Sequence, residues 1–137
     1  MGFSHGVNVA CIKAYKERIL TVVEVMVPCD NFLEAVDMLK EKPGLDVGMH
    51  LTLISEWENI KWGKITNAPS LVDENGCFYP MTWPDDAYTT TNALATSNWN
   101  LFEIEQELWA QIETILHYLP QGSHATPMWG FNQLLLK

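Results

Sequence analysis

The chain has 137 residues, of which 47% are hydrophobic, so it can bury a core and is not expected to be disordered. Its formal net charge of -9, from 17 acidic and 8 basic residues, disfavours nucleic acid and anionic membrane surfaces as partners. The sequence shows neither a signal-peptide pattern nor an apolar run of about 18 residues. Three scattered cysteines without a Cys-x-x-Cys pair are typical of reduced thiols, so we expect a cytoplasmic protein.

The first half of the chain alternates between helical and strand patterns. Residues 7–14 carry apolar side chains at helical spacing, and the stretch 21–27 is β-branched and nearly continuous in apolar residues, as a strand covered on both faces should be. Asp30 is placed to cap a second helix, which Pro43-Gly44 ends. The buried faces predicted for these two helices are Val7, Ala10, Cys11 and Ala14, and Phe32, Ala35, Val36 and Leu39. With the apolar run 45–53, this order predicts a β/α unit with a parallel sheet.

Residues 54–99 break that alternation and are rich in Trp, Pro, Asn, Thr and Asp. Such a long connection is usually functional or disordered, and its aromatic residues argue against disorder. Exposed aromatics suit stacking on sugar rings, although we favour a small core within the loop itself. A turn at residues 73–76 is expected to close a short hairpin.

Asn100 is expected to cap a third helix, with Glu103 completing a capping box. The predicted buried stripe of this helix is Ile104, Leu108, Ile112 and Ile115, and the side chains assigned to its solvated remainder are Glu103, Glu105, Glu107 and Glu113. Residues 122–126 then read as the start of another strand, which contains His124.

His50 is the most informative residue of the run 45–53. Strand side chains alternate, so Val47, Met49 and Leu51 share one face, and His50 lies on the other. An imidazole on an otherwise apolar strand needs a partner or a metal, because an unpaired buried polar group costs about 1–3 kcal/mol. From this run alone, a satisfied core histidine is the more common outcome.

Several segments together resemble one known family, the YdjC-like carbohydrate deacetylases. The matching segments are residues 2–8, 45–53, 56–63, 70–73, 103–113 and 123–124, and they cover almost the whole chain in the family's order. The resemblance implies an α/β fold of the TIM-like barrel type, and a divalent metal, Mg²⁺ or Zn²⁺, held by one aspartate and two histidines. It also implies an amino-sugar oligosaccharide as substrate, whose N-acetyl groups are hydrolysed.

The resemblance assigns roles to individual residues. His50 and His124 match the two metal-binding histidines, while His5, Asn8, Trp57 and Trp62 are weaker candidates for the rim of the sugar site. For His5 and Asn8 we favour helix N-terminal capping over sugar binding.

The chain also departs from the family pattern. A preceding strand with the metal-binding and catalytic aspartates is not seen before Met1, Met128 stands near a further family histidine, and the family continues beyond Lys137. Asp46 lies about 13 Å from His50 along the strand and cannot replace the missing ligand. Loop carboxylates that could reach the site are Asp30, Glu56, Asp85 and Asp86.

We therefore expect a single partial domain over residues 1–137, incomplete at both ends of its barrel, with impaired deacetylase activity. Unpaired strand edges would then favour self-association, so a homo-oligomer is possible. The alternative is a non-catalytic remnant that binds a sugar or another protein.

Overall fold

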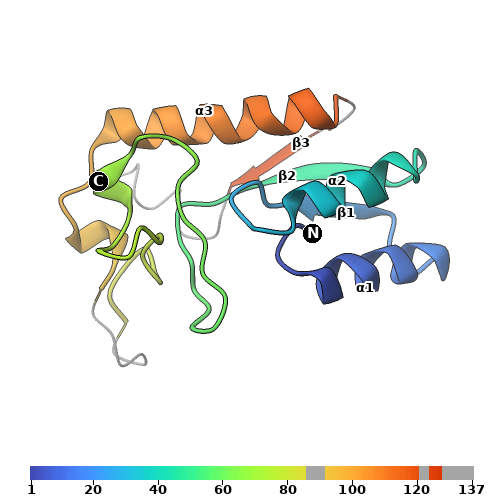
Figure 1. Ribbon diagram of the computed structural model, residues 1–137, viewed down its shortest axis with the longest axis horizontal. Coiled ribbons are helices and arrows are strands. Elements are labelled where there is room, and N and C mark those ends of the chain that lie inside the picture. Colours follow the sequence, from blue (N-terminus) through green and yellow to red (C-terminus); the bar gives the residue numbers. More distant parts are fainter. Residues whose placement is uncertain (86–91, 121–123, 128–137) are drawn as a thin grey trace. The chain divides into compact units, whose positions relative to one another are not determined.

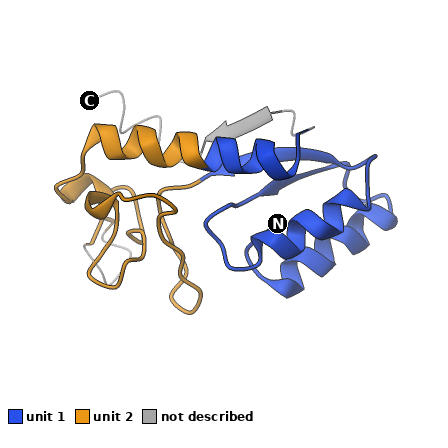
Figure 2. Cartoon of the chain, turned by 45° about the horizontal axis from the view of Figure 1, so that its top comes forward, with its two compact units in different colours: residues 1–51, 111–126 blue, residues 52–110, 127–137 orange. Residues whose placement is uncertain are grey.

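Tertiary contacts divide the chain into two compact units, which Figure 2 distinguishes by colour. The computed structural model describes residues 1–85, 92–120 and 124–127, the last four by their backbone alone. Unit 1 comprises residues 1–51 and 111–126, and unit 2 comprises residues 52–110 and 127–137. Within the described residues, no helix is both long and apolar enough to cross a bilayer.

Unit 1 is built on a small sheet. Strand β1 (Val22–Val25) pairs in parallel with β2 (Asp46–Leu51), and Val22 lies opposite Asp46. Strand β3 (His124–Pro127) is the neighbour of β2, which gives the order β1-β2-β3. The predicted α/β class and the parallel pairing are therefore confirmed, whereas a barrel stays a prediction.

One face of this sheet packs against helices. The core contains strand residues at alternate positions, together with one face of α2 (Phe32–Lys40) and the end of α3 (Leu101–Tyr118). Figure 1 shows α2 beside α1 (His5–Lys16). The four residues predicted to form the buried face of α2 are all buried. The strand residues that belong to the core are Val23, Val25, Val47 and Met49. Each fully buried aliphatic side chain of this kind stabilises the fold by about 1.5–3 kcal/mol.

Two local predictions for unit 1 were wrong by about one residue. The buried residue of α1 is Asn8, while Val7 is exposed, so the helix is turned by about one residue from the predicted apolar face. Of that face, Cys11 still packs against the core. Asn8 takes this place because its amide has polar partners in the interior. The second helix begins after Asn31, not Asp30, and Asn31 makes no side-chain cap.

Unit 2 contains the long segment predicted between the second strand and the third helix. It holds two short 3₁₀ helices, Pro69–Leu71 and Leu94–Thr96, and its core includes the buried residues Trp62, Leu71, Phe78 and Leu94. The turn at residues 73–76 is confirmed, because Asp73 and Gly76 bond across it and Val72 pairs antiparallel with Phe78. Gly76 has φ +78°, a conformation that favours glycine. The segment thus has the core of its own that we favoured.

Helix α3 begins with a modified cap. The Asn100 side chain accepts a hydrogen bond from the Phe102 N–H, as predicted. Glu103 does not complete the predicted capping box. Its carboxylate accepts from the backbone and hydroxyl of Ser70, at 2.8 and 2.7 Å, and the Ser70 Oγ accepts from the Asn100 N–H. Glu103 therefore ties the loop to the start of the helix.

The buried stripe of α3 differs from the predicted one. Ile104 and Ile115 are buried as expected, but Leu108 and Ile112 are only partly buried. The fully buried positions between them are Glu107 and Gln111, so the placement of Glu107 on the solvated face was wrong. Hydrophobic spacing missed it because the helix faces loop backbone here rather than a purely apolar core.

Glu107 is buried because it satisfies donors of the loop. Its carboxylate accepts from the backbone N–H groups of Ile65 and Thr66, at 3.0–3.1 Å, and from the Thr66 hydroxyl at 2.6 Å. A charged acceptor makes these hydrogen bonds stronger than neutral ones. The side chain therefore fixes residues 65–66 against α3.

We expect Glu107→Gln to destabilise the protein. The glutamine amide nitrogen cannot accept from the loop donors, and a buried donor without a partner costs about 1–3 kcal/mol. Urea denaturation monitored by tryptophan fluorescence measures the change. Glu113→Gln, an exposed change on the same helix, is the control. Equal stability of the two variants would show that the buried carboxylate does not hold the loop.

Candidate functional site

The candidate site of unit 1 centres on a carboxylate–imidazole pair. Glu24 of β1 and His50 of β2 lie on the sheet face opposite to Val23, Val25 and the core, near the carboxyl ends of the two strands. The His50 Nδ1 and the Glu24 Oε2 are 3.0 Å apart, and the two side chains are 33% and 37% exposed. His50 thus has the polar partner that its place on an apolar strand requires.

The pairing fixes the state of the imidazole. A carboxylate only accepts hydrogen bonds, so Nδ1 carries the hydrogen and, in the neutral ring, Nε2 keeps a lone pair. Metal-binding histidines in proteins usually donate their second ring nitrogen to a carboxylate in this way. Gly48, which lies across from Glu24 in the register, places no side chain between the two partners. The geometry therefore suits His50 as a ligand.

The donor set around this pair is incomplete among the described residues. No group of three or more His, Cys, Asp or Glu side chains placed to hold a metal occurs within them, whereas catalytic zinc usually has three protein ligands. His124 begins β3, the strand next to that of His50, but its side chain is outside the described part. Met128 and Asp86 also lie outside the described residues.

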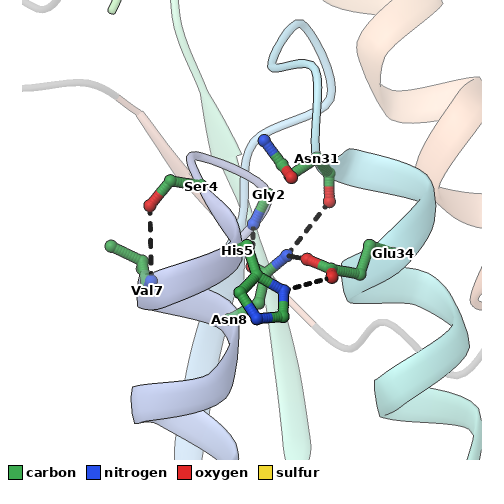
Figure 3. A network of polar contacts seen from close by, with 7 residues as sticks. All are labelled: Gly2, Ser4, His5, Val7, Asn8, Asn31 and Glu34. Carbon is green, nitrogen blue, oxygen red and sulfur yellow. Dashed lines mark hydrogen bonds and ion pairs between the residues drawn. The ribbon is translucent and has the colours of Figure 1, made fainter.

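His5 and Asn8 form a polar network at the start of α1, shown in Figure 3. The N-cap is Ser4, whose Oγ accepts from the Val7 N–H, so neither His5 nor Asn8 has the capping role that we favoured. The buried Asn8 side chain accepts from the Gly2 N–H at 2.8 Å and donates to Glu34 at 2.7 Å. His5 is exposed, and its Nδ1 lies 2.6 Å from the other Glu34 oxygen.

This network positions the first two residues beside β1. The Met1 N–H₃⁺ donates to the Glu24 carbonyl, and the Met1 carbonyl accepts from the Met26 N–H, the alternation found between parallel strands. Gly2 has φ +92°, and a Cβ there would lie 2.6 Å from the Met26 oxygen, so only glycine fits. Asn8 therefore acts on the backbone next to Glu24, a structural role.

The predicted aromatic candidates lie in unit 2 and differ in exposure. Trp57 is 58% exposed, whereas Trp62 is only 4% exposed and belongs to the interior. A buried indole offers no face to a sugar ring. Of the loop carboxylates proposed to reach the site, Asp30, Glu56 and Asp85 are exposed, and the ion pair with His50 is made by Glu24 instead.

Sequence reasoning missed Glu24. The signal was present, because Glu24 is the only charged residue in the predicted strand 21–27. A charge in the middle of such a strand requires a partner on the same face. Because the two predicted strands pair in parallel, His50 on the second strand could have been named as the partner of Glu24 on the first.

The pKa of Glu34 provides a test of the network. Its pKa is lowered, chiefly by the hydrogen bond from His5 and next by the one from Asn8. A depressed folded-state pKa stabilises the fold above the ordinary pKa of glutamate, and the contribution is lost as pH falls through the lower, folded-state pKa.

We therefore expect Glu34→Gln to reduce stability at neutral pH, with a difference from wild type that narrows as the solution is acidified below the ordinary pKa. Denaturant unfolding curves between neutral and acidic pH measure this difference. Asp37→Asn, an exposed change on the same helix, should show no such narrowing. A pH-independent difference for Glu34→Gln would contradict the assignment.

Comparison with known proteins identifies the family. The family model of the YdjC-like proteins matches residues 1–125. A carbohydrate deacetylase of Listeria innocua is 31% identical over 115 residues, covering 84% of this chain and 42% of the relative. A carbohydrate deacetylase of Brevibacillus brevis is 36% identical over 77 residues, covering 56% and 29%. The chain belongs to the YdjC-like family.

A solved structure agrees with this assignment. A crystal structure from Enterococcus faecalis, provisionally described as a cellobiose-phosphate cleavage protein, matches with a TM-score of 0.73 and 27% identity. The match covers 98% of this chain and 49% of the other. The chain thus spans less than half the length of the relatives that it matches.

Proposed function

We propose that this chain is part of a metal-dependent carbohydrate deacetylase, which hydrolyses N-acetyl groups of amino sugars such as chito-oligosaccharides. The observation that carries the proposal is the Glu24–His50 pair at the carboxyl ends of two parallel strands. In β/α folds this end of the sheet is where active sites form. Membership of a family whose relatives are named carbohydrate deacetylases supports the substrate class.

The chemistry of amide hydrolysis indicates the role that each residue would have. A divalent metal, Zn²⁺ or Mg²⁺, would supply polarisation of the acetyl carbonyl and a lower pKa for bound water. His50 would bind it through Nε2, Glu24 orients the ring, and His124 on the next strand would be the second histidine ligand. Because imidazole suits Zn²⁺, Co²⁺ and Ni²⁺ better than Mg²⁺, we favour the former ions.

The wider architecture is part of the same proposal. The helices that pack on one sheet face and the polar pair on the other support a TIM-like barrel whose interior the Glu24–His50 face would line. A homo-oligomer stays a prediction.

We expect His50→Ala to lose at least about tenfold in Zn²⁺ or Co²⁺ affinity, and Glu24→Gln about 10–100-fold, the usual cost of a lost supporting partner. Isothermal titration of the purified chain measures both. The control is His117→Ala, because His117 is an exposed histidine that lies on α3 and not on the sheet. Equal affinities of wild type and His50→Ala would remove His50 from the site.

The activity is tested by acetate release from the tetramer of N-acetylglucosamine, with Zn²⁺, Co²⁺ or Mg²⁺ added. Release should require an ion and fall to background in His50→Ala, and not in His117→Ala. A parallel assay with cellobiose phosphate tests whether the chain instead has the cleavage activity by which the Enterococcus protein is described. Impaired release by these 137 residues stays a prediction that the same assay measures.

Turnover that survives both a chelator and His50→Ala would refute the proposed mechanism. Binding of the tetramer without any acetate release would instead favour a sugar-binding role without catalysis.

A further inference from the structure

A cavity lies within unit 2, on the exposed face of α3. Its volume is about 430 Å³, within the ~300–1,000 Å³ range of small-molecule sites. One wall is a helix face with residues at spacing i, i+3, i+4 and i+7, and the other wall is formed by two residues of the loop. The lining residues are Phe102, Glu105, Gln106 and Trp109 on the helix, and Thr66 and Asn67 on the loop.

The two walls are fixed to each other. Buried Glu107 holds the Thr66 backbone and hydroxyl, and Glu103 holds Ser70 on the other side of Asn67. Glu103 and Glu107 of α3 thus hold the loop whose residues Thr66 and Asn67 form the other wall of the cavity. The cavity is therefore preformed, which lowers the ordering cost of binding.

The lining matches the chemistry of a sugar ring. Phe102 and Trp109 expose 63% and 57% of their surface, a large apolar area for side chains on a helix. Flat aromatic faces suit the apolar C–H face of a pyranose, and the amide and hydroxyl groups beside them suit its hydroxyls. The polar neighbours are Thr66, Asn67 and Gln106.

The charge of the cavity selects among sugars. Glu105 is the only charged residue among the described residues that line the cavity, and it is exposed, as is Glu113. The helix α3 carries neither Lys nor Arg. An acidic surface of this kind attracts cations. The cationic sugar is a glucosamine unit with a free ammonium group.

We propose that this cavity binds amino-sugar oligosaccharides that carry at least one free ammonium group, with the ring stacked on Trp109 and the ammonium beside Glu105. The ligand class rests on the proposed function, because removal of an acetyl group from N-acetylglucosamine produces this unit. The cavity would hold a partly deacetylated oligosaccharide by the glucosamine unit that deacetylation produces.

A second copy of the chain is the main competing occupant. The centre of a protein–protein interface is depleted in charged residues, whereas this cavity combines a carboxylate, two amides and a hydroxyl with two aromatic rings. The carboxylate and the two amides therefore favour the sugar, whereas the aromatic rings suit either occupant.

The test is an NMR titration of the ¹⁵N-labelled chain with three tetramers: glucosamine, N-acetylglucosamine and cellotetraose. The glucosamine tetramer should bind about tenfold more tightly than cellotetraose, and added salt should reduce this preference because the contact is electrostatic. Trp109→Ala should abolish binding at this cavity, and Glu105→Gln should remove the preference for the charged sugar. The matched controls are Leu116→Ala and Glu113→Gln, exposed changes on the same helix outside the cavity.

The site is separable from the metal site. His50→Ala should leave glucosamine binding at Trp109 unchanged, and Trp109→Ala should leave Zn²⁺ binding unchanged, so each proposal can fail alone. Equal binding of all three tetramers, or binding unaffected by Trp109→Ala, would overturn the inference. Sedimentation that shows a dimer dissociated by Trp109→Ala would overturn it in favour of a second copy.

Discussion

The pleat of two parallel strands is the constraint on which unit 1 depends. Successive side chains alternate, so a register that turns Val23, Val25, Val47 and Met49 toward the helices must turn Glu24 and His50 to the opposite face. Burial of the apolar residues fixes that register, because a slip by one residue would exchange the faces. The energy that orders the polar pair therefore comes from the hydrophobic core behind it, and the 3.0 Å hydrogen bond adds orientation.

Unit 2 is held together in a different way, since most of its residues form no regular sheet. Its backbone groups still need hydrogen-bond partners, and α3 supplies some of them through Glu103 and Glu107. A buried carboxylate can accept several hydrogen bonds at once, so one side chain holds two adjacent residues of the loop. This is how a helix can fix an irregular segment without strand pairing.

The sequence predicted the elements of this fold better than their buried faces. The helix over Phe32–Lys40 was predicted with its whole core face, because apolar spacing alone decides a helix that packs on valines. For Asn8 and Glu107 the spacing failed, because a polar side chain is buried when its partner is loop backbone, and such a partner is set by tertiary structure. In the same way His50 could be selected by its place on a strand, while Glu24 became its partner only through the register.

Polar residues at positions where the local pattern would favour apolar ones therefore fall into two kinds. Asn8 and Glu107 direct their polar atoms to backbone and side-chain groups of the chain itself, so their burial is explained by folding. The Glu24–His50 pair is half-exposed, and only one imidazole nitrogen takes part in it. A buried polar residue is thus weak support for a site, whereas a polar pair that is rigidly held and still accessible is strong support. By this criterion the face of β1 and β2, and not the acidic helix interior, is where the chemistry of this protein is to be sought.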